Sequence, residues 1–263
     1  MIDHWKDKLA VITGASSGIG EAVSRKLAAE GFRVVLVARR RERLEKLAEQ
    51  IRTGGGTARI LTADLTCEAD RDILCKEASS ADVLVNNAGL GWYGYGDEMA
   101  WKTALEMLQV NVEAVVQLSL TFLSKMRQRN TGHIINVGSI SGSLPSQGVA
   151  LYGATKSFLD NFTTALHREL AGTHVHVSVV RAGPVKTEFG EMAFRHANGM
   201  HLPTEKMGVT AEKVAERIST LIRRPRRLIY VPDYLRLVPW LELSFGWIID
   251  WLGPLLLKKQ RTA

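Results

Sequence analysis

Short runs of β-branched and aliphatic residues alternate with longer amphipathic segments along most of this 263-residue chain. Runs that are apolar throughout, rather than at every second residue, are typical of parallel strands covered by helices on both faces. The alternation therefore predicts an α/β fold with one doubly wound parallel sheet of about seven strands. The expected strands are 9–13, 33–38, 58–64, part of 81–89, 132–139, 175–183 and 227–232. The main expected helices are 20–31, 41–52, about 101–128 and about 150–171.

No linker, repeat or low-complexity stretch divides the chain, so a single domain is expected. Residues 1–232 account for the sheet and its helices. Residues 233–263 form a tail that is much more apolar than a solvated C-terminus, and the pattern favours helix. Such a surface is expected to meet its own core, a second subunit or a membrane.

The net charge of +7 arises from 34 Lys+Arg against 27 Asp+Glu. The excess is concentrated at 39–43, 223–227 and 258–261, which permits nucleic acid, anionic lipid or phosphorylated ligands. No helix-turn-helix, zinc finger or RNA-binding signature is present, so a nucleic-acid partner is not expected.

Metal binding is not expected either. Cys67 and Cys75 lie eight residues apart, which fits neither a zinc knuckle nor a redox pair, so both are interpreted as free thiols in a reducing compartment. His174 and His176 alternate along a strand without a third ligand. The N-terminus is too polar before its first apolar run to be a signal peptide, and a cytoplasmic location is expected.

The stretch TGASSGIG at 13–20 lies where the first strand turns into the first helix. Gly14, Gly18 and Gly20 allow a tight turn and a close backbone approach. The N-terminus of the following helix offers free N–H groups and a positive dipole to a pyrophosphate. In this strand–turn–helix context the glycines predict a nucleotide site in a Rossmann-type sheet.

Tyr152 and Lys156, in the stretch YGATK, are four residues apart in an expected helix and share one of its faces. The pair is consistent with either of two roles. It could be a buried structural contact in which both polar groups have hydrogen-bond partners, or it could take part in catalysis. A free phenol has a pKa of about 10, and a nearby ammonium would lower that pKa toward neutral pH. Tyr152 would then be a general acid for ketone reduction or a base for alcohol oxidation.

Five motifs in this order resemble the classical short-chain dehydrogenase/reductase family over roughly 7–232. They are TGASSGIG, Asp64-Leu65, NNAG at 86–89, Asn111, and Ser139 with YGATK. The resemblance implies an NAD(P)-dependent oxidoreductase acting on CH–OH groups (EC 1.1.1.-). The catalytic residues that it implies are Asn111, Ser139, Tyr152 and Lys156. Ser139 would bond the substrate oxygen, and Asn111 would hold a water that links Lys156 to solvent.

The resemblance also implies a set of cofactor-binding residues. They are Gly14, Ser16, Ser17, Gly18, Ile19, Gly20, Arg39, Arg40, Asp64, Leu65, Asn87, Ala88, Gly89, Tyr152, Lys156, Gly183, Val185 and Thr187. Ala182 stands where the family usually has the first proline of the segment that holds the nicotinamide amide. The geometry of that loop is therefore in question, although its role is not.

The end of the second strand distinguishes the two nicotinamide cofactors. An acid there would hold a ribose 2′-hydroxyl, whereas arginine suits a 2′-phosphate. Ala38 occupies the position of the acid, and Arg39 and Arg40 follow it. NADP(H) is therefore expected rather than NAD(H), unless these arginines only begin a solvated helix.

In the family the segment after the sixth strand closes the substrate pocket, here 188–207, and a second wall is expected from 90–101. Both segments are apolar and aromatic, with Phe189, Met192, Phe194, Met200 and Leu202 in the first, which favours a lipophilic carbonyl or secondary alcohol. Two alternatives remain. One is a 3-oxoacyl thioester reductase with a carrier-protein partner, for which Arg127, Arg129 and 223–227 would form a patch. The other is a nucleotide-binding sensor or scaffold without turnover, against which the intact catalytic set argues.

The resemblance further implies a homodimer or homotetramer paired through helices at about 101–128 and 150–171. The tail adds a second expected contact. At about 100° per residue Trp240, Trp247 and Trp251 fall on one helix face, and basic residues precede and follow the segment. Glu242 and Asp250 make a spanning helix unfavourable. A peripheral, in-plane membrane contact and packing against protein are both open.

Overall fold

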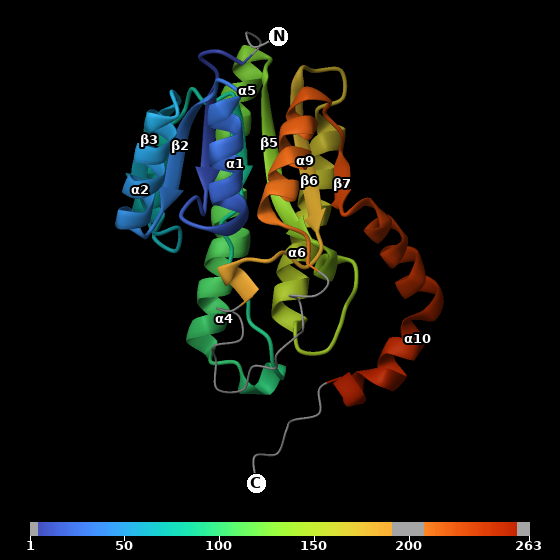
Figure 1. The fold of residues 1–263 in the computed structure, drawn as a ribbon. Helices are drawn as coiled ribbons and strands as arrows, with labels where there is room; N and C mark the ends of the chain where they lie inside the picture. Colours follow the sequence, from blue (N-terminus) through green and yellow to red (C-terminus); the bar gives the residue numbers. More distant parts are fainter. Residues whose placement is uncertain (1–4, 191–207, 257–263) are drawn as a thin grey trace.

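The computed structural model describes residues 5–190 and 208–256, and these form seven parallel strands in one sheet flanked by helices (Figure 1). The strand order is β3-β2-β1-β4-β5-β6-β7. The strands are β1 Leu9–Thr13, β2 Arg33–Ala38, β3 Thr57–Thr62, β4 Val83–Asn86, β5 Gly132–Ser139, β6 Val175–Ala182 and β7 Leu228–Val231. The predicted doubly wound sheet is confirmed.

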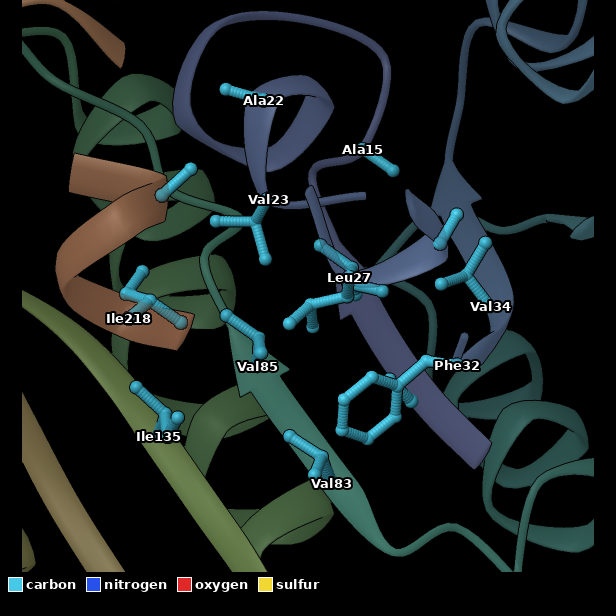
Figure 2. Close-up of a cluster of buried hydrophobic side chains, with 14 of the residues drawn as sticks. Ala15, Ala22, Val23, Leu27, Phe32, Val34, Val83, Val85, Ile135 and Ile218 are labelled. Carbon is cyan, nitrogen blue, oxygen red and sulfur yellow. The ribbon is translucent and has the colours of Figure 1, made fainter. Parts of the chain in front are cut away.

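Helices cover both faces of the sheet. Buried side chains of α1 (Gly18–Ala29), α2 (Arg41–Thr53) and α9 (Ala211–Arg223) form one core with the strands. Side chains of α3 (Glu68–Glu77), α5 (Ala114–Arg129) and α6 (Ala150–Glu169) form the other. Figure 2 shows part of the first core, where Val23 and Leu27 of α1 and Ile218 of α9 meet strand residues Val85 and Ile135. Continuous burial on both faces explains why the strands are apolar throughout.

The strand order reverses beside β1, which pairs with β2 on one side and with β4 on the other. In open parallel sheets a ligand crevice forms outside the carboxyl ends of the strands at such a switch point. The glycine-rich turn between β1 and α1 lies there.

The helical stretch predicted at about 101–128 is three segments in series: α4 (Trp101–Leu108), the π-helical segment η2 (Gln109–Glu113) and α5. By length and composition Trp101–Arg129 would be long and apolar enough to cross a membrane, but half of its apolar window is buried inside the protein. Leu118, Phe122 and Met126 pack on the sheet, so we describe it as a core helix.

The tail begins with the 3-10 turn η4 (Asp233–Leu237), followed by α10 (Val238–Leu256), which breaks at Phe245, where φ is −135°. In Figure 1 α10 stands away from the sheet and from the other helices. Its large apolar side chains are exposed, including Trp240 (69%), Trp247 (65%) and Trp251 (74%). The predicted helical, apolar tail is therefore found, although the break means that one regular helix face is not continuous through it.

Candidate functional site

A cavity of about 410 Å³ lies at the carboxyl ends of the strands. Its lining comes from the turn after β1, the ends of β2, β4 and β5, the helix α6 and the segment after β6. Of the predicted cofactor-binding residues, all except Gly20 line this cavity, as do Ser139, Tyr152 and Lys156. The cavity therefore joins the glycine-rich turn and the Tyr–Lys pair, which are more than a hundred residues apart in the chain.

The glycine-rich turn leaves no room for side chains. Gly14 and Gly18 have φ values of +66° and +56°, in the left-handed region that glycine adopts at low cost. A Cβ at Gly14 would lie 2.8 Å from Asn87 Nδ2, and one at Gly20 would lie 2.2 Å from Gly14 O. Gly20 thus acts behind the turn, by letting α1 approach it. The exposed backbone at the N-terminus of α1 fits a dinucleotide pyrophosphate.

Thr13 connects the turn to the end of β4, a role that was not predicted. Its Oγ1 accepts hydrogen bonds from the backbone N–H groups of Asn87 and Ala88, both at 3.0 Å. Asn87 Nδ2 in turn donates to Thr13 O at 3.0 Å. The threonine at the start of TGASSGIG was the available signal, because only its hydroxyl can serve two backbone donors there.

Two arginines face the cavity at the end of β2. Arg40 donates to Ser16 Oγ (2.9 Å) and Ser17 Oγ (2.7 Å) and pairs with Glu188 at 3.0 Å. Arg39 lies 3.7 Å from Asp64. Glu188 was not predicted, because its partners are about 145 positions away in the chain.

The carboxylates beside these arginines stay ionised. Hydrogen bonds from Arg43 and Arg40 lower the pKa of Glu188. Burial raises the pKa of Asp64, but hydrogen bonds from Thr66 and the Arg39 charge outweigh it, so the net shift is downward. Three arginines (39, 40 and 43) face two carboxylates (64 and 188) in this cluster, which leaves a net positive charge that suits a phosphate.

Tyr152 and Ser139 meet inside the cavity. The structure corrects the expectation that Lys156 lowers the pKa of the phenol: burial raises the pKa of Tyr152, and a hydrogen bond with Ser139 opposes this only in part. The ammonium lies 5.8 Å from the centre of the Tyr152 ring and donates to Val137 O at 2.9 Å instead. Tyr152 is therefore a neutral phenol here, which suits a proton donor.

Lys156 is buried, and its pKa is lowered to about 8, because burial disfavours the ammonium more than the charge of Asp160 favours it. Its Nζ would be 3.7 Å from a Cβ on Gly89. The lysine thus reaches from α6 across to the loop after β4, where it is close to both the phenol and the nucleotide end of the cavity.

Asn111 does not line the cavity. Its Oδ1 accepts from Leu90 N at 2.8 Å, and its Nδ2 donates to Leu90 O and Thr155 Oγ1 at 2.9 and 3.1 Å. These bonds tie η2 to the loop after β4 and to α6, so the amide has a structural role. Holding a water for Lys156 stays a prediction.

The segment after β6 closes the cavity on one side. Gly183 N donates to Val231 O at 2.8 Å, and Val185 pairs with Val209 in an isolated bridge. A Cβ at Gly18 would lie 2.9 Å from Thr187 Cγ2. With Ala182 in place of the usual proline, β6 still pairs through Ala182 with Val231, and the loop keeps its position against the glycine-rich turn.

The far end of the cavity is apolar and aromatic. It is lined by Leu90, Trp92, Tyr93, Val149 and Phe189. The Phe189 ring lies 5.7 Å from that of Tyr152. The other predicted pocket residues, Met192, Phe194, Met200 and Leu202, lie outside the described residues.

The histidines do not form a metal site among the residues that the structure describes, where no cluster of three potential ligands occurs. His133 is buried, with Nε2 2.7 Å from Ser178 Oγ, and burial lowers its pKa to about 3. His176 packs edge-on against it at 5.7 Å and is partly buried, as expected for a residue of the strand β6. His174 is exposed and lies one residue before that strand, so its predicted place in the strand is corrected. Both cysteines are free.

Comparisons with known proteins agree with this geometry. The family model described as short chain dehydrogenase matches residues 8–198. The NADP-dependent 3-hydroxy acid dehydrogenase of Escherichia coli (strain K12) is 35% identical over 221 residues, which cover 80% of this chain and 87% of that protein. Two solved structures are also similar. Serine dehydrogenase complexed with NADP+ is 31% identical (TM-score 0.77, 84% of this chain, 93% of that one). A Sphingobium yanoikuyae short-chain dehydrogenase in complex with NADPH is 26% identical (TM-score 0.80, 97% and 98%).

Proposed function

The chain belongs to the short-chain dehydrogenase/reductase family of oxidoreductases, and from that premise we propose that it is an NADP(H)-dependent enzyme for a lipophilic ketone or secondary alcohol. The observation that carries the proposal is the single cavity that holds the glycine-rich turn, the two arginines and the Ser139–Tyr152–Lys156 set. A nucleotide sensor would need the glycine-rich turn and the arginines, but it would not need the Ser–Tyr–Lys set.

In this mechanism the bound nicotinamide supplies or accepts the hydride, and the side chains handle the proton and the charge. Tyr152 Oη donates its proton to the substrate oxygen during reduction and accepts one during oxidation. Ser139, already hydrogen-bonded to Tyr152, stabilises the negative charge that develops on that oxygen. Lys156 places its ammonium 5.8 Å from the centre of the Tyr152 ring; in the cofactor-free protein it does not bring the pKa of the phenol below its usual value, and its proposed role is to hold the cofactor.

The choice of NADP(H) is supported by chemistry at the mouth of the cavity. Arg39 and Arg40 line it at the end of β2, and no acid stands at position 38. A guanidinium offers several donors in one plane to a 2′-phosphate. Similar proteins that carry NADP in their descriptions point the same way.

The lipophilic substrate is supported by the far end of the cavity. Among the described lining residues the only cations are Arg39, Arg40 and Lys156, all on the nucleotide and catalytic side. A hydroxy-acid substrate would need a cation for its carboxylate, whereas Leu90, Trp92 and Phe189 offer apolar surface. The proposed substrate therefore differs from the 3-hydroxy acid that gives the similar Escherichia coli dehydrogenase its name.

The carrier-protein alternative has less support. Arg129 donates to Ser79 O and Ala81 O at 3.1 and 2.8 Å, so it fastens the turn before β4. Residues 223–227 precede β7 at its amino end, and none of these basic residues lines the cavity. A carrier docked on them would face the edge of the sheet opposite the active site.

The proposal includes two contacts of the whole molecule. Exposed apolar side chains on the helices predicted to pair between subunits, such as Trp101 (71%), Leu120 (48%) and Phe158 (41%), support a homodimer or homotetramer. The exposed indoles of α10 support a peripheral contact of a cytoplasmic enzyme with a membrane surface.

The test is a screen of ketones of graded chain length, with NADPH oxidation as the readout, using the parent and Tyr152→Phe. We expect kcat/KM to rise with apolar chain length. Tyr152→Phe should keep NADPH binding and lose at least about a hundredfold in kcat, the typical contribution of a positioned general acid. Tyr234→Phe, an exposed tyrosine on η4, is the control. Binding without turnover across the panel would favour the sensor instead.

A further inference from the structure

Helix α6 carries a third ionisable side chain in line with the catalytic pair. Tyr152, Lys156 and Asp160 are spaced by four residues, so they occupy successive turns of one face. Asp160 is 4% exposed and the proposed mechanism does not use it. A carboxylate is rarely this buried without a partner, because removing its charge from water is costly.

One oxygen of Asp160 is held from the neighbouring strands. Arg181 of β6 donates from Nε to Asp160 Oδ2 at 2.9 Å. The same guanidinium donates from Nη1 to Tyr230 Oη of β7 at 2.6 Å and lies 5.4 Å from the centre of that ring. Two strands therefore fix the carboxylate in one orientation.

The other oxygen faces the catalytic end of β5. Asp160 Oδ1 is buried and has no hydrogen-bond partner within the described part of the chain. It lies 3.3 Å from where a Cβ on Gly138 would be. Gly138 stands between Val137, whose carbonyl accepts the bond from Lys156, and Ser139. An uncompensated oxygen at this point directs negative charge toward Lys156.

We infer that Asp160 is the buried counter-charge that keeps Lys156 in its ammonium form, and that Arg181 and Tyr230 hold its carboxylate in place. Asp160 is thus a positioning residue, and its effect on turnover rests on the proposed function. The arrangement explains how a charged lysine is tolerated at a buried position: a fixed anion one turn away offsets part of the desolvation cost of the ammonium.

The titration behaviour agrees with this geometry. Burial lowers the pKa of Lys156 to about 8, and the charge of Asp160 opposes that change. Burial raises the pKa of Asp160, while Arg181 and Lys156 lower it. Among the described residues, the titratable groups that face Lys156 are Tyr152 and Asp160 on α6, with Arg181 of β6 behind Asp160. The loop after β4 and strand β5 present backbone and amide groups.

The inference is tested by titrating Lys156 directly in the cofactor-free protein. Lysine labelled with ¹³C at Cε gives a resonance that is assigned by its absence from Lys156→Met. Asp160→Asn should lower the titration midpoint by about one pH unit or more, because a unit charge one helical turn away acts through a medium of low dielectric constant. Arg181→Gln should raise it, because a nearby positive charge is removed. Asp160→Glu should restore a midpoint near that of the parent.

Shifts of the Lys156 midpoint in opposite directions in the two variants indicate an electrostatic effect. Loosened packing would instead shift the midpoint of both variants in the same direction. If Asp160→Asn does not fold, the double variant Asp160→Asn/Arg181→Gln is compared with Arg181→Gln alone, and its midpoint should be lower. A midpoint unchanged by loss of the Asp160 charge, or shifts of the same sign, would overturn the inference.

Turnover provides the second readout. In Asp160→Asn the decline of ketone reduction with rising pH should move to lower pH by the same interval as the midpoint. A shift of the resonance in a protein without turnover on any ketone would sustain the role of Asp160 and reject the proposed function. Turnover of a ketone together with an unchanged Lys156 midpoint in Asp160→Asn would support the proposed function and reject the role of Asp160.

Discussion

Burial acts in opposite ways on the two ionisable side chains of the proposed reaction. It raises the pKa of Tyr152 and lowers that of Lys156, because in each case the neutral form is favoured away from water. The phenol therefore keeps its proton for donation, while the ammonium is present at a cost to the folded state. A catalytic lysine that destabilises its own site should be visible in the pH dependence of unfolding.

The pKa of Lys156 in the folded protein is about 8, below the ordinary lysine value of 10.5. Below pH 8 Lys156 is protonated in both the folded and the unfolded protein, and the folded state is destabilised by the full cost of burying the ammonium. Between pH 8 and 10.5 the unfolded chain binds more protons, so this group makes the folded state more stable as pH rises. We expect Lys156→Met to raise the free energy of unfolding of the cofactor-free protein by up to roughly 3 kcal/mol at pH 7, with no gain above pH 10.5.

Urea unfolding of Lys156→Met at pH 7 and at pH 10.5 measures this difference. Lys46→Met, at an exposed position on α2, is the matched control and should change stability little at either pH. An equal gain at both values would mean that packing, rather than charge, is responsible.

Substitution of Arg39 tests the preference for NADPH over NADH more directly than substitution of Arg40. Arg40 also bonds Ser16 and Ser17, so its loss would loosen the glycine-rich turn for either nucleotide. Among the residues that the structure describes, Arg39 pairs with Asp64 at 3.7 Å and does not contact the glycine-rich turn. Arg39→Gln should raise KM for NADPH about ten- to a hundredfold, the equivalent of one charge-assisted phosphate bond, and leave KM for NADH nearly unchanged.

Arg41→Gln is the control, because Arg41 pairs with Glu45 on α2 and does not line the cavity. The measurement is the ratio of the two KM values for each variant. Equal losses for NADPH and NADH in Arg39→Gln would show that the arginine supports the loop and not a phosphate.

At the scale of elements, the sequence predicted what depends on local pattern. Strand β5 begins at Gly132 and ends at Ser139, as the apolar run 132–139 indicated. The interruption of the long helix by η2 was not predicted, because it depends on Asn111 reaching Leu90 across the fold. Glu188 was missed for the same reason. The order of the motifs indicated which residues gather at the site, but contacts between distant segments needed the structure.

Thr13 shows how much a single contact between elements contributes. It is 1% exposed, and its hydroxyl serves the N–H groups that follow β4. Thr13→Val keeps the shape of the side chain but removes the acceptor of two half-buried backbone N–H groups. We expect a loss of about 1–3 kcal/mol in stability for each unmet donor and weaker NADPH binding, because the turn and the loop after β4 both line the cavity.

Chemical denaturation and NADPH titration of Thr13→Val measure the two effects. Thr57→Val, at an exposed position of β3, is the control. A variant as stable as the parent would mean that other acceptors, or water, replace the hydroxyl.

At the scale of the molecule, the direction of the strands separates features that are close in the sequence. Residues 223–227 lie before β7 and α10 follows it, so the basic cluster and the start of α10 are at opposite ends of that strand (Figure 1). The strand β7 lies between this cluster and α10, so a joint contact of the two with anionic lipid stays a prediction. The second basic cluster, 258–261, lies outside the described residues. The exposed indoles of α10 are the part of this predicted contact that the structure describes.

The structure also shows where the tail can be removed. Leu235 in η4 is buried, and its Cδ1 would lie 2.6 Å from a Cβ on Gly183, so η4 supports the loop that lines the cavity. A deletion of 238–263 spares η4 and takes away α10, and among the side chains of α10 that the structure describes none lines the cavity. Turnover of a water-soluble ketone should therefore persist within a few-fold.

Co-sedimentation with anionic vesicles and subunit mass by light scattering, measured on the same samples, then distinguish the two contacts proposed for α10. We expect the truncated protein to lose vesicle binding and keep its mass, because interfacial indoles favour the boundary of a bilayer. Replacing Trp240, Trp247 and Trp251 together by Gln should reproduce the loss in a full-length chain. Trp101→Gln, an equally exposed indole on α4, should not. If the full-length protein ignores the vesicles and the deletion only changes the mass, α10 is a contact between subunits, because its exposed apolar side chains must then be covered by protein.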